Sequence, residues 1–251
     1  MSVWKGFKEF IVSDKVAENE YIYSFYLTSI DDERLPDYLP GQFIAIRVQN
    51  EDGTWSRPRQ YTLSSVSNGK YFKISVKREP EGDVSKKLCD TVHKGDLVKI
   101  STPTGKFVLK DDEKSVVLIG GGIGITPMLT MAYKAIESHP SVHLIYSLPN
   151  SNYHAFEEKI KNLVNNHENL KITTVYTRPL LADEAQRRFD LKGRLSKEWL
   201  QENVNLNSVF YFCGPVEFMR SIYHYLIELG VTPENIHYEL FAPGQDITKS
   251  I

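Results

Sequence analysis

Cysteine and long hydrophobic runs are scarce in this sequence. Only two of its 251 residues are cysteine, Cys89 and Cys213. Two thiols exclude a disulfide framework, a four-cysteine zinc site and a 2Fe–2S cluster held by this chain alone. No stretch approaches the roughly 18 consecutive apolar residues that span a membrane. The sequence therefore predicts no metal site and no membrane span, and reduced thiols are typical of a cytoplasmic protein.

Strong net charge is also absent. The formal net charge is −2, with 30 Lys and Arg against 32 Asp and Glu. Such a balance gives no reason to expect nucleic acid or an anionic membrane as a partner. Met1–Phe10 is charged and lacks an apolar core, so we expect no secretory signal there. An apolar content of 41% is ordinary for a globular protein, whose 251 residues allow one large domain or two small ones.

Up to about residue 109 the pattern is one of short strands separated by turns. Turn signals such as Asp52-Gly53 and Asn68-Gly69 lie between segments rich in Val, Ile, Tyr, Phe and Thr. This pattern predicts an antiparallel barrel or sandwich, interrupted by one short helix at Val84–Thr91. The expected strands are Lys8–Lys15, Tyr21–Thr28, Gln42–Gln49, Gln60–Ser65, Lys70–Lys77 and Leu97–Ser101.

After a change of composition near residues 109–114, strands alternate with helices. This alternation predicts a parallel sheet covered on both faces. The expected strands are Ser115–Ile119, Val142–Ser147, Ile172–Thr177, Ser208–Cys213 and Ile236–Leu240. The expected helices are Pro127–Ser138, Ala155–Asn165, Lys197–Glu202 and Val216–Leu229.

A glycine-rich stretch joins the first strand and helix of the second half. It reads Gly120-Gly121-Gly122-Ile123-Gly124-Ile125-Thr126-Pro127. Without Cβ atoms, the backbone N–H groups can approach an anion closely, and the following helix adds the positive end of its dipole. The stretch is not the dinucleotide fingerprint G-x-G-x-x-G, because the third position falls on Ile125 or Pro127. A phosphate loop and an ordinary tight turn both fit this stretch alone.

Two stretches in the first half also suit an anion. Arg59-Gln60-Tyr61-Thr62 offers a guanidinium, a phenol and a hydroxyl, which can clamp a diphosphate, lie along an aromatic ring system and donate one hydrogen bond. Gly82-Asp83-Val84-Ser85 precedes the short helix, with Ser85 as the expected N-cap and free N–H groups at the helix start. A strand with polar side chains and a simple cap are the alternatives.

Tyr211-Phe212-Cys213-Gly214-Pro215 ends a late strand of the second half. In open parallel sheets ligands lie across the carboxyl ends of the strands, so we expect Cys213 to share an edge with Gly121–Thr126. The alternative is a buried cysteine that acts as a small hydrophobe.

These motifs, in this order and at this spacing, resemble the ferredoxin–NADP reductase superfamily. Within it the sequence is most similar to the reductase portion of flavohaemoglobins, from about Trp4 to Pro243. Further blocks that resemble this family are Trp4–Phe7, Leu39–Phe43, Ser75–Glu79, Asn152–Phe156 and Ile236–Glu239.

The resemblance implies an antiparallel six-stranded FAD-binding β-barrel at residues 1–109, followed by a Rossmann-like parallel α/β NAD(P)-binding domain at residues 114–251. It implies that Arg59 pairs with the FAD pyrophosphate, Tyr61 lies against the flavin and Thr62 hydrogen-bonds near flavin N5. The other implied FAD contacts are Phe43, Gln60, Gly82, Val84, Ser85, Glu239, Leu240, Phe241, Ala242 and Pro243. The implied NAD(P)H contacts are Gly121, Gly122, Ile123, Gly124, Ile125, Thr126, Pro127, Cys213, Gly214 and Pro215. The implied catalytic residues are Thr62, Cys213 and Glu239.

The predicted function is that of an FAD-dependent NAD(P)H oxidoreductase. It takes hydride from NAD(P)H onto FAD and passes electrons to an external acceptor such as a haem or iron–sulfur protein, a quinone or a small oxidant. Hydride transfer belongs to the cofactors, so we expect no catalytic triad among the seven histidines. The resemblance includes no globin portion, so oxygen or nitric oxide chemistry is not implied. A non-catalytic FAD- or nucleotide-binding subunit that senses redox state is the alternative, and a Rossmann dehydrogenase is disfavoured.

The sequence departs from the family pattern at two places. Thr62 stands where Ser is common, which keeps the hydroxyl, and Ala242 stands in Phe-Ala-Pro where Phe-Gly-Pro is usual. The choice of nucleotide rests on a third observation. Ser147–Asn152, where a 2′-phosphate would be expected, contains no Arg or Lys, and Arg178 is the nearest candidate. We therefore predict NADH in preference to NADPH.

Overall fold

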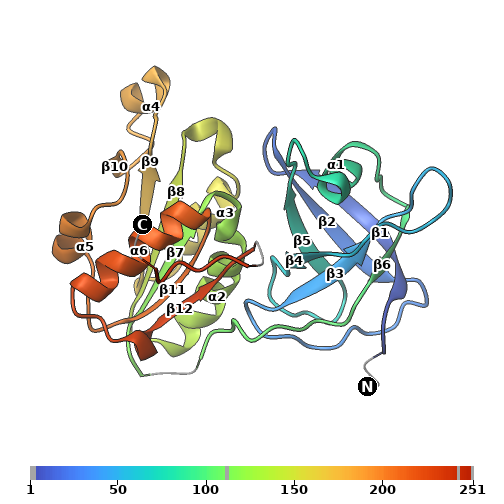
Figure 1. Ribbon diagram of the computed structural model, residues 1–251, viewed down its shortest axis with the longest axis horizontal. Helices are drawn as coiled ribbons and strands as arrows, with labels where there is room; N and C mark the ends of the chain where they lie inside the picture. Colours follow the sequence, from blue (N-terminus) through green and yellow to red (C-terminus); the bar gives the residue numbers. More distant parts are fainter. Residues whose placement is uncertain (1–3, 111–112, 242–243, 250–251) are drawn as a thin grey trace. The chain divides into compact units, whose positions relative to one another are not determined.

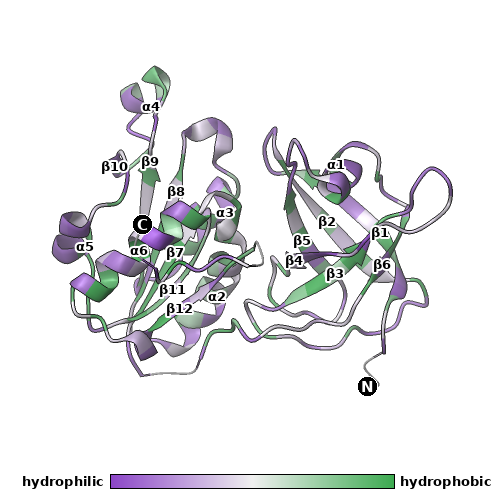
Figure 2. Cartoon of the chain, viewed as in Figure 1, coloured by the Kyte–Doolittle hydropathy of each residue, from purple (hydrophilic) through white to green (hydrophobic). Residues whose placement is uncertain are grey.

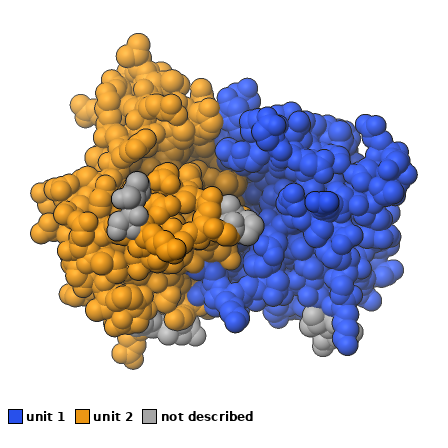
Figure 3. Space-filling view, viewed as in Figure 1, with its two compact units in different colours: residues 1–108 blue, residues 109–251 orange. Residues whose placement is uncertain are grey.

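The computed structural model describes residues 4–110, 113–241 and 244–249. The chain divides into two compact units, residues 1–108 and residues 109–251 (Figure 3). Each unit has its own sheet and its own hydrophobic core.

The first unit is an antiparallel barrel (Figure 1). Its sheet has the strand order β4-β3-β6-β1-β2-β5. A bridge between Leu63 and Ile74 joins β4 to β5, the two outermost strands in this order, and so closes the sheet. The prediction of a six-stranded antiparallel barrel is confirmed. The strands are β1 (Lys8–Ala17), β2 (Ile22–Ser29), β3 (Phe43–Arg47), β4 (Arg59–Thr62), β5 (Phe72–Lys77) and β6 (Leu97–Ile100).

One helix, α1 (Asp83–Asp90), packs on this barrel. Its side chains Val84, Leu88 and Cys89 are buried and belong to the same core as the strands. Val84 and Leu88 are four residues apart, close to one helical turn, and Cys89 adjoins Leu88, so the three form one apolar face. The helix is short, so packing rather than intrinsic propensity holds it in place.

The second unit is a parallel sheet in the order β10-β9-β8-β7-β11-β12. Every residue of β7, β8 and β11 is buried, as expected for strands covered on both faces, and Figure 2 shows these strands as mainly apolar. The strands are β7 (Val116–Gly121), β8 (Val142–Leu148), β9 (Leu170–Tyr176), β10 (Leu191–Lys192), β11 (Val209–Cys213) and β12 (Ile236–Glu239). The α-helices are α2 (Ile125–Ser138), α3 (Glu157–Asn165), α4 (Leu181–Ala185), α5 (Lys197–Asn203) and α6 (Val216–Glu228).

The second unit differs from expectation in several elements. Strand β7 extends two residues further than predicted, to Gly121, and helix α2 begins two residues earlier, at Ile125. Helix α3 begins two residues later than predicted, because Phe156 takes a left-handed conformation with φ of 64° before the first turn. Strand β10 and helix α4 span two and five residues, which is too short for a periodic pattern to reveal them. None of the described helices is long and apolar enough to cross a membrane.

Candidate functional site

The glycine-rich stretch forms the turn from β7 into α2. Strand β7 ends at Gly121, residues Gly122–Gly124 form a single 3₁₀ turn, and α2 begins at Ile125. Gly122 has φ of 53°, a conformation that favours glycine, and no atom lies within 4 Å of the place of a Cβ. The N-cap Gly124 provides no capping side chain, and the first turn of α2 contains no acidic residue. The N–H of Ile125 donates within the 3₁₀ turn, and no side chain caps the start of the helix. The absence of a side-chain cap and the helix dipole fit the diphosphate of a nicotinamide nucleotide.

This loop packs directly against the end of β11. A Cβ on Gly124 would lie 2.3 Å from the carbonyl oxygen of Cys213, so only glycine fits at this contact. The parallel register places Gly120 of β7 beside Cys213 of β11, and Cys213 beside Glu239 of β12. The prediction that Cys213 shares an edge with the glycine loop is confirmed.

Phe218 of α6 supports the same contact and was not predicted from the sequence. Its ring would meet a Cβ on Gly121 or on Gly214 at 2.9 Å, so the ring fills the space that both glycines leave. The signal in the sequence is an aromatic residue in the first turn of the helix that follows Gly214-Pro215.

Two side chains at this edge, Thr126 and Cys213, are uncharged near neutral pH, and a third, Glu239, is partly ionised. Thr126 is buried, and its hydroxyl donates to the carbonyl of Ile123 at 3.0 Å. Burial raises the pKa of the Cys213 thiol well above its usual value, so the group is a neutral thiol. Burial also raises the pKa of the Glu239 carboxyl, to about 7. Glu239 thus exchanges a proton in the physiological range beside a thiol that does not.

The segment that follows β12 is fixed again further along the chain. Phe241 is 48% exposed, whereas Ile247 is fully buried in the core of the second unit. The guanidinium of Arg220 on α6 donates to the carbonyls of Asp246 and Lys249, both at 3.0 Å. Of the predicted FAD contacts, Ala242 and Pro243 lie outside the described residues.

In the first unit, four predicted FAD contacts, Arg59 to Thr62, make up β4. Arg59 is exposed, and its guanidinium donates to the carbonyl of Pro58 at 3.1 Å without pairing with a carboxylate in the described part of the chain. Tyr61 packs partly against the barrel core, and burial raises the pKa of its phenol. Thr62 is buried opposite Phe43 on β3, and its hydroxyl makes no hydrogen bond with another described residue. The strand thus offers a ligand a guanidinium without a carboxylate partner and a hydroxyl without a hydrogen bond to the described residues.

The start of α1 corrects one prediction. The N-cap is Gly82 rather than Ser85, and no side chain caps the helix. Ser85 is the third helical residue, and its hydroxyl instead accepts the N–H of Glu79 at 3.3 Å. The hydroxyl oxygen of Ser85 lies only 2.2 Å from the position that a Cβ on Gly82 would take, so the turn requires glycine.

The first-turn N–H groups of α1 are therefore left without a capping side chain, and this arrangement fits the pyrophosphate of FAD. The acidic residue of this turn, Asp83, is paired with Lys87 at 2.8 Å, which offsets its charge.

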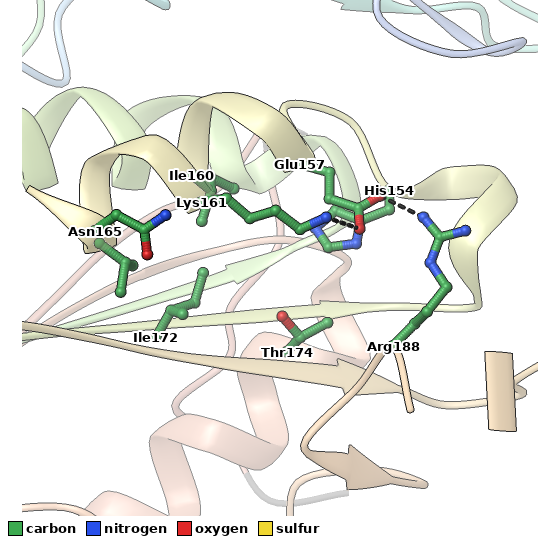
Figure 4. A pocket seen from close by; sticks show the side chains of 9 residues that line it. His154, Glu157, Ile160, Lys161, Asn165, Ile172, Thr174 and Arg188 are labelled. Atoms are coloured by element: carbon green, nitrogen blue, oxygen red, sulfur yellow. Dashed lines mark hydrogen bonds and ion pairs between the residues drawn. The ribbon is translucent and has the colours of Figure 1, made fainter. Parts of the chain in front are cut away.

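A separate cavity of about 150 Å³ lies between α3 and β9 (Figure 4). Glu157, at the start of α3, pairs with Lys161 and with Arg188. His154 Nδ1 hydrogen-bonds to the hydroxyl of Tyr176 at 2.8 Å, and burial lowers the pKa of His154 to about 4. None of the site residues predicted from the sequence lines this cavity. We interpret the network around it as a structural support for the chain that leads into α3.

Comparison with known proteins agrees with these geometries. Residues 9–109 match the family described as Oxidoreductase FAD-binding domain, and residues 118–224 match Oxidoreductase NAD-binding domain. A flavohemoprotein of Bacillus cereus is 41% identical over 253 residues, which cover 97% of this chain and 63% of that protein. The chain thus spans less than two thirds of this relative.

Two solved structures extend the comparison. The flavohaem-like FAD/NAD-binding domain of nitric oxide dioxygenase from Vibrio cholerae is 33% identical, with a TM-score of 0.84 over 94% of this chain and 99% of that chain. Phthalate dioxygenase reductase, described as a modular structure for electron transfer from pyridine nucleotides to a 2Fe–2S centre, is 26% identical. Its TM-score is 0.76, over 96% of this chain and 70% of that chain.

A barrel that matches an FAD-binding family and a parallel α/β unit that matches an NAD-binding family define a flavin-dependent NAD(P)H oxidoreductase. Both matched families are described as oxidoreductase domains, so the alternative of a non-catalytic redox-sensing subunit is not favoured. The chain belongs to the ferredoxin–NADP reductase superfamily, together with the FAD/NAD-binding portion of the flavohaemoglobins.

Proposed function

We propose that this chain is the reductase component of an electron-transfer system. It takes hydride from NADH, or less efficiently from NADPH, onto FAD and delivers electrons to a separate redox centre, a haem or an iron–sulfur group. The observation that carries the proposal is the uncapped glycine turn of α2, packed against Cys213 and Gly214, in a chain whose first hundred residues match an FAD-binding family. The reduced state implied for its two free thiols suits a cytoplasmic location.

We assign FAD binding to residues 1–109 and NAD(P)H binding to residues 114–251. The extents of the family matches and of the compact units support this division. FAD, when bound, supplies the chemistry that converts a two-electron hydride into single electrons. The protein's part is to bind, orient and exclude water.

In the barrel, Arg59 and the first-turn N–H groups of α1 would hold the pyrophosphate, because the guanidinium forms no ion pair in the described part of the chain and the N–H groups have no side-chain cap. Phe43 and Tyr61 would give apolar contact to the ring system and ribityl chain, and the free hydroxyl of Thr62 would donate a hydrogen bond to it. The remaining predicted FAD contacts belong to the same two elements, β4 and the start of α1: Gln60, Gly82, Val84 and Ser85.

In the α/β unit, Gly121–Gly124 would hold the diphosphate of the nucleotide, and Thr126 and Cys213 would line the nicotinamide pocket. A neutral thiol and a buried hydroxyl place no fixed charge there. Glu239 gains or loses a proton near pH 7, and ionised it would favour a positively charged ring. Leu240–Pro243 would complete this side of the site.

The proposal predicts fast reduction of bound flavin by NADH. Apoprotein reconstituted with FAD is mixed anaerobically with NADH or NADPH, and the loss of visible flavin absorbance is followed. We expect reduction by both, with kcat/KM at least about tenfold higher for NADH, a difference of about 1.4 kcal/mol, because Ser147–Asn152 contains no basic side chain and only the more distant Arg178 can reach a 2′-phosphate. Alanine at Arg178, which is exposed after β9, should affect only NADPH. Bound flavin that neither nucleotide reduces would instead indicate a redox-sensing subunit.

A second prediction concerns Glu239 and pH. Its pKa is raised in the folded state, so its contribution to stability is present at low pH and is lost as pH rises through about 7. The variant Glu239→Gln has no such proton, so its free energy of unfolding should change less between about pH 5 and 8 than that of the wild type. Denaturant titrations across this range measure the difference. The exposed Glu202→Gln on α5 serves as control and should follow the wild type.

A further inference from the structure

A lysine from the barrel wall caps the carboxyl end of α1, opposite to the end that faces the proposed phosphate site. The ammonium nitrogen of Lys15 on β1 donates to the carbonyls of Leu88 at 3.2 Å, Cys89 at 2.7 Å and Val92 at 2.7 Å. The last carbonyls of a helix have no intrahelical donor. Lys15 provides a donor for the carbonyls of Leu88 and Cys89 in the last turn. It also donates to the carbonyl of Val92, the residue after the C-cap Thr91.

A β-bulge turns Lys15 toward α1. In the pairing of β1 with β2, Val12 lies opposite Leu27 and Asp14 opposite Tyr26, so Ser13 is an extra residue. An extra residue shifts the inward and outward alternation by one position. Lys15 therefore lies opposite the fully buried Phe25 and shares its core-facing side, although strict alternation from buried Val12 would turn it outward.

The ammonium group of Lys15 is packed so that its positive charge lies at the carboxyl end of α1. The nitrogen lies 5.2 Å and 5.4 Å from the ring centroids of Tyr23 and Phe25. Burial lowers the pKa of Lys15, and the negative charges of Asp90 and Asp96 oppose that change. The ammonium forms no ion pair within the described ranges, and its direct partners are carbonyl oxygens at the negative end of the helix dipole.

We propose that Lys15 is a positioning residue for the pyrophosphate of FAD. Helix α1 has eight residues, so about 12 Å separates its two ends, and such a helix does not hold its shape alone. Lys15 ties one end to β1 and offsets the dipole there, which fixes the direction of the uncapped N–H groups at the other end. The inference rests on the proposed function, in that FAD is the ligand at those N–H groups.

The test compares two ligands that differ in their phosphates. Apoprotein is titrated with FAD and with riboflavin, which has the ring and ribityl chain but no pyrophosphate, and flavin fluorescence reports binding. For Lys15→Met, which keeps an apolar stem, we expect the Kd for FAD to rise about tenfold and the Kd for riboflavin to stay the same. Lys15→Arg keeps the charge and the donors and should recover most of the FAD affinity. Lys94→Met removes an exposed charge before β6 and should change neither value.

Each outcome decides the inference. An unchanged FAD affinity in Lys15→Met would overturn it, as would an equal loss for FAD and riboflavin, because that result reports a general loss of barrel structure. If Lys15→Met does not fold, the same comparison of the Kd values for FAD and riboflavin is made with Lys15→Gln, which keeps hydrogen-bond donors without the charge. A wild-type protein that binds no FAD would refute the proposed function itself, and with it the role of Lys15.

Discussion

Replacing Gly124 by alanine is expected to abolish flavin reduction by NADH while FAD remains bound. The added Cβ would lie 2.3 Å from the carbonyl oxygen and 2.5 Å from the carbonyl carbon of Cys213, and neither backbone atom can move without displacing β11. The glycine loop and Cys213 would separate, and the nucleotide site with them. We expect a loss of at least about 100-fold in the rate of reduction, since displacements near 1 Å carry such costs. Anaerobic stopped-flow absorbance and the flavin content of the purified variant measure the two effects.

Gly230→Ala provides the matched control. Gly230 follows α6 with φ of 83°, and no atom lies within 4 Å of its Cβ position. This variant carries only the backbone strain of a left-handed alanine, about 1–2 kcal/mol. It should be less stable yet reduce flavin at the wild-type rate. Normal reduction in Gly124→Ala would mean that the nucleotide binds elsewhere, and loss of FAD in that variant would mean that the loop belongs to the flavin site.

Replacing Arg59 by alanine is expected to weaken FAD binding by about 100-fold, because two charge-assisted hydrogen bonds to a pyrophosphate contribute about 1.5–3 kcal/mol each before compensation. The guanidinium pairs with no carboxylate of the described chain, so its loss should cost little stability in the apoprotein. Fluorescence titration with FAD gives the affinity, and thermal unfolding of the apoprotein gives the stability.

Arg34→Ala removes the same charge from the same unit and serves as control. Arg34 is exposed and lies 3.8 Å from Asp37, an arrangement that contributes little. FAD affinity should be unchanged in this variant, and riboflavin should bind Arg59→Ala as it binds the wild type. Equal loss of FAD affinity in both arginine variants would show that general charge, rather than a specific contact of Arg59, attracts the cofactor.

Much of the fold could be predicted because its elements carry local signals. The six barrel strands and the change to alternating strands and helices are visible in residue type and turn residues. The shared edge of Cys213 and the glycine loop followed from a general property of parallel sheets, that their carboxyl ends meet. Closure of the barrel through Leu63 and Ile74, in contrast, is a long-range contact that no local pattern reveals.

The errors in the site have the same origin. Serine is a residue type typical of an N-cap, but whether its hydroxyl caps a helix depends on where the helix begins. Helix α1 begins after Gly82, so Gly82 rather than Ser85 is the N-cap. The need for glycine at Gly124 depends on the carbonyl of Cys213, which is distant in sequence. The inward turn of Lys15 depends on an extra residue in β1, which the strand pattern alone does not locate.

The anchored tail changes how Phe241 should be regarded. Glu239 is held in β12, and Ile247 is held in the core under the hydrogen bonds of Arg220. Phe241 therefore lies between two anchored segments of the second unit, so its ring is tethered within a few residues of β12. The ring stays at a high effective concentration near the carboxyl end of β12, so a ligand that needs this place competes with a tethered side chain rather than with solvent.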